Sequence, residues 1–173
     1  MKKHLHSLLL AATSLLGCLL VSCAGSTNTA ALVPANARAS KHTGQPVQAM
    51  VAGGGPRSSV LATISNEDFK QALESSLVQS GMFKRADSGG YQVEAFITSI
   101  EQPAFGVSMQ VSMEVSYALK RGGSTILRKS IKSTYTAPFG EAIVGAVRLR
   151  KATEGAAREN IALLIKSLDE KSF

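Results

Sequence analysis

The stretch Val107 to Leu119, VSMQVSMEVSYAL, decides the fold. Every second residue along it is apolar, and the positions between are mostly Ser, Gln and Glu. A period of two sends alternate side chains to opposite faces of a β-strand, so the stretch predicts a strand with one buried face. Met109 and Met113 fall on the apolar face. Together with Met50, they are expected in the core and not as soft metal ligands.

The sequence on either side of this stretch extends the sheet. Residues 91 to 98 alternate in the same way, with Phe96 on the polar face. Arg121-Gly122-Gly123-Ser124 is typical of a hairpin turn, and a return strand is expected from Thr125 to Thr136. Three successive strands of this kind predict an antiparallel meander.

Helical patterns lie before and after the meander. Ser65 is a good N-cap for a helix over residues 66 to 80, and a second helix is expected over 141 to 168, with a possible interruption at Gly155. Val47 to Ala52 is a short apolar strand candidate. The order β-α-β-β-β-α predicts an α+β fold, a meander sheet packed against two helices, in one domain over residues 46 to 173. The position of the first strand in the sheet stays open.

The N-terminus carries a secretory pattern. Lys2 and Lys3 precede an apolar run from Leu8 to Val21, which is short for a transmembrane helix. The run ends in Leu20-Val21-Ser22-Cys23, which resembles a bacterial lipobox. The resemblance implies that residues 1 to 22 are a lipoprotein signal peptide and that Cys23 is acylated. Cys18, after Leu15-Leu16-Gly17, is a competing lipobox cysteine.

The residues after Cys23 suggest where the anchor holds the protein. By the sorting pattern of Gram-negative lipoproteins, Ala24 implies the outer membrane. We expect the domain to face the periplasm, although exposure at the cell surface is not distinguished. Residues 23 to 45 are rich in Ala, Ser, Thr, Asn, Gly and Pro, which predicts a flexible tether.

Charge suggests a class of partner. Without the signal peptide, 17 basic residues face 12 acidic ones, a net charge of about +5. A cluster at Arg148, Arg150, Lys151 and Arg158 is a candidate contact for an anionic ligand or a protein partner. Aromatic residues make up only 5% of the chain, and the chain is predicted to be secreted, so nucleic acid is not expected as a partner.

Cysteine and histidine are scarce where chemistry would need them. Cys18, His4 and His6 leave with the signal peptide, Cys23 is the anchor, and His42 falls in the expected tether. We therefore predict no catalytic residue, no metal site and no cofactor in the domain.

Several short matches carry a resemblance to a known family: Gln102-Pro103-Ala104-Phe105-Gly106, Met109 to Tyr117, Tyr135-Thr136-Ala137, Gly145 to Arg150 and Asn160-Ile161. Together they resemble small proteobacterial lipoproteins of undefined function, which often carry the label "UDP-N-acetylglucosamine acyltransferase". Enzymes of that name use hexapeptide repeats and a histidine base. The domain predicted here has neither.

The sequence therefore predicts a non-enzymatic, lipid-anchored envelope protein that serves as an accessory or assembly subunit and binds a protein partner. A module for anionic envelope lipid or polymer, such as lipopolysaccharide or peptidoglycan, is the alternative. The acyltransferase of the label is a third hypothesis. Oligomeric state is left open.

Overall fold

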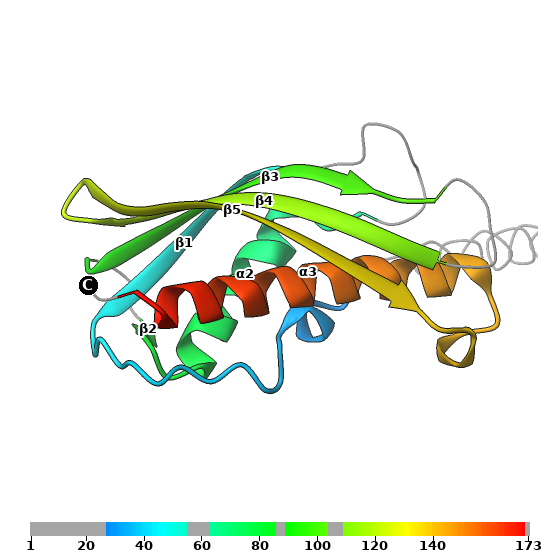
Figure 1. The fold of residues 1–173 in the computed structure, drawn as a ribbon, viewed down its shortest axis with the longest axis horizontal. Coiled ribbons are helices and arrows are strands. Elements are labelled where there is room, and N and C mark those ends of the chain that lie inside the picture. Colours follow the sequence, from blue (N-terminus) through cyan, green and yellow to red (C-terminus); the bar gives the residue numbers. More distant parts are fainter. Residues whose placement is uncertain (1–26, 55–62, 86–88, 104–108, 172–173) are drawn as a thin grey trace, which may run out of the picture.

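The computed structural model describes residues 27–54, 63–85, 89–103 and 109–171. It is an α+β fold in which one sheet packs on two helices, as Figure 1 shows. The elements in chain order are η1 (Thr29–Leu32), β1 (Pro46–Gly53), α2 (Asn66–Gln79), β2 (Lys84–Arg85), β3 (Tyr91–Glu101), β4 (Met109–Arg121), β5 (Ser124–Ala137), η2 (Phe139–Glu141) and α3 (Gly145–Asp169).

The predicted meander is confirmed. Strands β3, β4 and β5 pair antiparallel in sequence order, and Val115 of β4 lies opposite Ile97 on one side and Ile131 on the other. The alternating apolar residues of β4 all lie on the face that the helices cover, from Val111 to Leu119. Met113 is buried as predicted. Phe96 lies on the opposite face, also as predicted, with 53% of its surface exposed.

The structure also resolves the position of the first strand. β1 lies next to β3 and parallel to it, so the sheet is mixed, with the order β2-β1-β3-β4-β5. A parallel pair needs a crossover connection, and α2 lies in the segment that makes it. The two-residue strand β2, which the sequence pattern did not indicate, pairs with β1 at the outer edge.

The helices begin where local chemistry allows. Ser65 caps α2 as predicted, because its Oγ accepts the amide of Asp68 at 3.0 Å. The second helix was expected from residue 141, but α3 starts at Gly145, because Ala142 and Val144 have extended backbones. Gly155 does not interrupt α3. It lies against the ring of Tyr135, which a Cβ at this position would overlap.

The two helices cover one face of the sheet only. α3 packs on β4 and β5, and α2 packs on β1, so the core lies between one helix layer and one sheet layer. In Figure 1 both helices lie beneath the sheet. Phe69, Leu73, Ile161 and Leu164 are among the helical side chains that fill this space. The other face of the sheet carries no described element.

The expected tether is wrong over residues 27 to 45, which pack against the domain. Leu32 of η1 is fully buried against α2 and α3. The amide of Ala39 donates to the Ser80 carbonyl at 3.0 Å, and that of Thr43 donates to the Met82 carbonyl at 2.9 Å. Composition suggested a free chain because this segment has no repeating apolar pattern. It is held by a few apolar side chains, mainly Leu32 and Ala39, and by a series of backbone hydrogen bonds, which need no such pattern.

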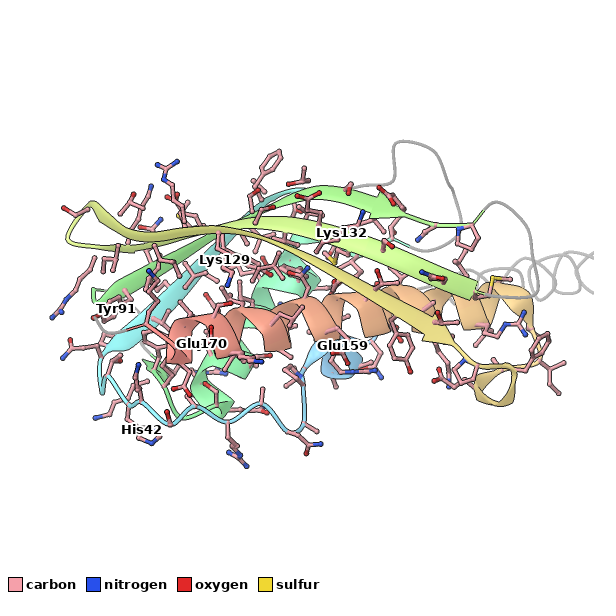
Figure 2. All side chains as sticks on the ribbon, viewed as in Figure 1. His42, Tyr91, Lys129, Lys132, Glu159 and Glu170 are labelled. Atoms are coloured by element: carbon pink, nitrogen blue, oxygen red, sulfur yellow. The ribbon has the colours of Figure 1, made fainter. Side chains whose placement is uncertain are left out.

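His42 lies in this packed segment, so its predicted place in the tether changes as well. It belongs to the folded domain, where its Nδ1 lies 2.6 Å from the carbonyl oxygen of Gly81. Figure 2 shows it on the segment that runs beneath the helices. The prediction that His42 lies in a tether outside the folded domain was therefore wrong.

Candidate functional site

The uncovered face of the sheet holds a groove of about 650 Å³. It follows from the register of four strands, which sets Ala52, Phe96, Ser116 and Ser130 in one row. The next row consists of Met50, Glu94, Ala118 and Arg128. In both rows the residue on β4 is small, Ser116 in one and Ala118 in the other. The large apolar side chains lie to one side of them, Met50 on β1 and Phe96 on β3. The groove therefore has an apolar wall on the β1–β3 side, a floor of small residues on β4 and a polar edge on β5.

Met50 contributes to this groove, contrary to the expectation that it belongs to the core. It is 58% exposed, because Val47 and Ala49 occupy the covered face of β1 and the alternation places Met50 on the other face. Together with Phe96 it gives the groove two exposed large apolar side chains. The sequence signal for this site was Phe96 itself, an aromatic residue out of phase with the apolar face of its strand.

The charges around the groove are mostly paired. Lys120 donates to Glu94 at 2.6 Å, and Ser130 donates to Glu114 at 2.8 Å. Lys132, marked in Figure 2, lies 4.0 Å from Glu101. Arg128 differs from its neighbours, since in the described part of the chain it has no hydrogen bond or ion pair. It gives one edge of the groove an uncompensated positive charge.

The four predicted basic residues do not form one exposed cluster. Arg148 is 5% exposed, and its guanidinium lies over the Phe139 ring, 4.1 Å from the ring centre. Arg150, Lys151 and Arg158 line a separate pocket of about 360 Å³. Arg158 donates to the Ala31 carbonyl at 3.1 Å, so part of its role is to hold η1.

Carboxylates share the pocket with the three basic residues. Glu154 lies 3.9 Å from the Nε of Arg150 and accepts the amide of Asn28 at 3.0 Å. Glu141 accepts the hydroxyl of Tyr135 at 2.8 Å, and this hydrogen bond, with burial, raises the pKa of Tyr135. The charge in this pocket is therefore close to balanced. A polyanion that entered it would meet two carboxylates as well as the basic groups.

A polar network lies inside the core, between α3 and the sheet. The Tyr117 hydroxyl donates to Asn160 at 2.8 Å, and the amide of Asn160 donates to the Ile131 carbonyl at 2.9 Å and to Ser133 at 3.0 Å. Burial raises the pKa of Tyr117 well above its usual value. Every member of the network is buried and has a hydrogen-bond partner, so we interpret it as structural.

Metal-binding groups do not gather in the described residues: no set of three or more His, Cys, Asp or Glu side chains lies close enough to hold an ion. Within the same residues, no helix has both the length and the apolar character needed to cross a membrane.

Asp169, at the end of α3, fastens the N-terminal segment. Its carboxylate accepts the amides of Ser40 and Lys41, both at 2.9 Å, and these bonds lower its pKa below the usual value of 3.8. We call these hydrogen bonds from Ser40 and Lys41 to Asp169 the clamp. Because the pKa of Asp169 is lower in the folded state than in the unfolded state, the stabilisation by the clamp is fully present above the unfolded-state pKa. It is lost as the pH falls through the folded-state pKa.

We expect the amides of Ser40 and Lys41 to lose protection from hydrogen exchange below the pKa of Asp169, while core amides of β4 stay protected. Asp169→Ala should remove the same protection at every pH. Hydrogen exchange followed by NMR checks both results. Protection of the two amides that is equal in the variant and the wild type would contradict the clamp.

Comparisons with known proteins support the fold and little more. No family model matches the chain, and no curated protein matches its sequence. The fold is similar to that of a DUF330-family protein from Xanthomonas campestris, with a TM-score of 0.51, 11% identity, and coverage of 76% of this chain and 90% of that one. It is also similar to PelC from Paraburkholderia phytofirmans, solved as a dodecamer, with a TM-score of 0.50, 14% identity, and coverage of 79% and 95%.

A minor lipoprotein from Acinetobacter baumannii aligns with 72% of this chain and 92% of its own, at 8% identity and a TM-score of 0.49. At these identities the likeness extends to the fold alone. The chain thus shares its α+β fold with the Xanthomonas protein and with PelC.

Proposed function

We propose that this chain is a non-enzymatic, lipid-anchored envelope protein, an accessory or assembly subunit that binds a protein partner on the uncovered face of its sheet. The lipobox supports the anchor at Cys23, and Ala24 supports the outer membrane with the domain in the periplasm. The observation that carries the binding role is the groove between Met50, Phe96 and Arg128.

The groove indicates what the partner must present. Exposed Phe96 and Met50 favour an apolar side chain, because burying apolar surface is worth about 25 cal/mol per Å². Arg128 favours a carboxylate next to it, because its guanidinium would donate charge-assisted hydrogen bonds to the carboxylate oxygens. The proposed partner segment therefore carries an apolar residue followed closely by an acidic one.

A second copy of this chain is a partner that the test must separate from a different protein. PelC, which has a similar fold, was solved as a dodecamer. Self-association at the groove would bring Phe96 of one copy against another, and crosslinks would then join two identical chains.

The experiment is site-specific photocrosslinking in intact cells. A photoreactive residue at Ser130, at the edge of the groove, is expected to give one dominant crosslinked product. The same residue at Ser124, exposed on β5 but outside the groove, should give none. Phe96→Ala and Arg128→Glu should each remove the Ser130 product, because they delete the apolar wall and reverse the free charge.

Mass spectrometry of the product then decides the proposal. A different protein, joined through a segment with an apolar and an acidic residue, supports it. A product that survives both groove variants, a product between two copies of this chain, or no product from Ser130 contradicts it.

The alternative role, binding of an anionic envelope polymer through the four predicted basic residues, is less well supported by the geometry. Arg148 is buried against the Phe139 ring, and Glu141 and Glu154 share the pocket with the other basic residues.

A further inference from the structure

Three large apolar side chains are exposed where the chain passes from η2 into α3. Phe139 is 61% exposed, Ile143 97% and Val144 61%. A single exposed apolar residue is ordinary, but a group of them marks a surface that meets another apolar phase. The three residues occur within six positions of the chain, beyond the end of the sheet. No packing role in the described structure accounts for Ile143.

The first two turns of α3 are basic, which is unfavourable for an isolated helix. The positive end of a helix dipole prefers acidic residues, but the first turn of α3 has none and Arg148, Arg150 and Lys151 follow. The cap residue Val144 offers no side-chain hydrogen bond to the free amides there. Basic side chains and open amides at one helix end together favour an anion.

Arg148 is the second, independent sign of an absent anion. It is 5% exposed, and in the described structure its buried Nε and Nη1 have no hydrogen-bond partner. Side chains on a helix lean toward its N-terminus, so this guanidinium lies near the apolar residues, over the Phe139 ring. Leaving buried donors of a charged group unpaired is costly. A phosphate at this end would supply acceptors.

The position of the proposed anchor agrees. The amide of Asn28 is 3.0 Å from Glu154, nine residues into α3, or about 14 Å from its start at 1.5 Å per residue. Cys23 is four residues before Thr27, and four residues span at most about 14 Å. An acylated Cys23 would therefore keep the membrane surface within reach of the start of α3.

We infer that Phe139, Ile143, Val144, Arg148, Arg150 and Lys151 form a docking end that lies on the anionic surface of the bilayer. The apolar side chains enter the boundary between headgroups and acyl chains, and the basic ones bind lipid phosphates. Figure 1 places η2 and the start of α3 at the opposite end from the β4–β5 hairpin, so the hairpin points away from the membrane. The groove then faces sideways, open to a partner.

This inference depends on the lipid anchor of the proposed function, and the test separates the two. In the acylated chain the thiol of Cys23 is blocked, so a cysteine placed at Ile143 can be labelled alone with a fluorophore that responds to polarity. Ile126→Cys, at the β5 end near the hairpin, is the matched control, since Ile126 is also an exposed isoleucine. Both proteins are purified as the full acylated chain and reconstituted in vesicles of phosphatidylcholine with or without phosphatidylglycerol.

On phosphatidylglycerol vesicles we expect the label at residue 143 to shift to the blue and to be quenched by nitroxide-bearing lipids. The label at residue 126 should respond as it does in water. Arg150→Gln with Lys151→Gln should abolish the difference between anionic and neutral vesicles, and high salt should do the same.

A label at residue 143 that behaves like the one at residue 126 on anchored protein overturns the docking end. So does shielding that depends on protein concentration and not on lipid, since it would indicate a second copy, and so does shielding produced only by a soluble anionic polymer. An N-terminal peptide of the membrane-derived protein that carries no acyl group on Cys23, measured by mass spectrometry, would instead contradict the anchor, and with it the proposed function.

Discussion

Leu32→Ala is expected to lower the free energy of unfolding by about 2–5 kcal/mol, the usual range for a leucine removed from a core. Leu32 has no exposed surface and packs against both helices, although it lies in a segment whose composition suggests a free chain. The loss combines the transfer of its side chain to water with the cavity left between η1, α2 and α3. Urea unfolding of wild type and variant measures the difference.

The matched control is Leu163→Ala, on the outer side of α3. Leu163 is 40% exposed, so its truncation should change stability by well under half as much. If Leu32→Ala were as mild as Leu163→Ala, residues 27 to 45 would behave as the tether that composition predicts, and the domain would begin near residue 46.

Asn160→Leu should destabilise the fold by about 2–4 kcal/mol, although leucine is similar in volume and fully apolar. The amide joins Tyr117, Ser133 and the Ile131 carbonyl inside the core. Replacing it takes this partner from the buried Tyr117 hydroxyl and Ile131 carbonyl, at a cost of about 1–3 kcal/mol for each group left unsatisfied, while Ser133 keeps its bond to the Ala156 carbonyl. Chemical unfolding measures the change.

A double-mutant cycle shows whether the network is the cause. Adding Tyr117→Phe to Asn160→Leu removes one of the unpaired groups, so the pair should cost about 1 kcal/mol less than the sum of the two single changes. Strict additivity, or a mild effect of Asn160→Leu alone, would show that the Tyr117 hydroxyl and the Ile131 carbonyl find other partners and that the network does not support the core.

The alternation of apolar residues made the central sheet predictable. The buried residues from Val111 to Leu119 specify one face of β4 through a period of two, and each neighbouring strand repeats the rule. The position of β1 could not be read in the same way. Its alternation states which face is buried, but nothing local to it distinguishes the edge strand β5 from β3 as its neighbour.

The N-terminal segment escaped prediction for a related reason. Its attachment depends on backbone amides and on groups distant in sequence, such as the Asp169 carboxylate that holds Ser40. Periodicity reports only elements that repeat a contact along one face. A few buried apolar side chains and a set of backbone hydrogen bonds leave no repeat.

The candidate site was partly visible in the sequence. Charge in the sequence marked four basic residues, Arg148, Arg150, Lys151 and Arg158. In the structure Arg148 lies on the Phe139 ring, the other three line one pocket, and Arg158 also donates to η1. The groove is formed by the register of four strands, and register joins residues as distant as Met50 and Arg128. The second helix was predicted to begin at residue 141, which placed Ile143 inside it. In the structure Ile143 lies before α3 and is exposed.

The lipid anchor at Cys23 is tested most directly by the mass of the mature N-terminal peptide, released by protease from protein purified out of the membrane fraction. We predict a mature chain that begins at Cys23 and carries a diacylglyceryl group and acyl chains on that residue. A mature chain that begins at Cys18, or an unmodified Cys23, would contradict the anchor on which both the function and the docking end depend.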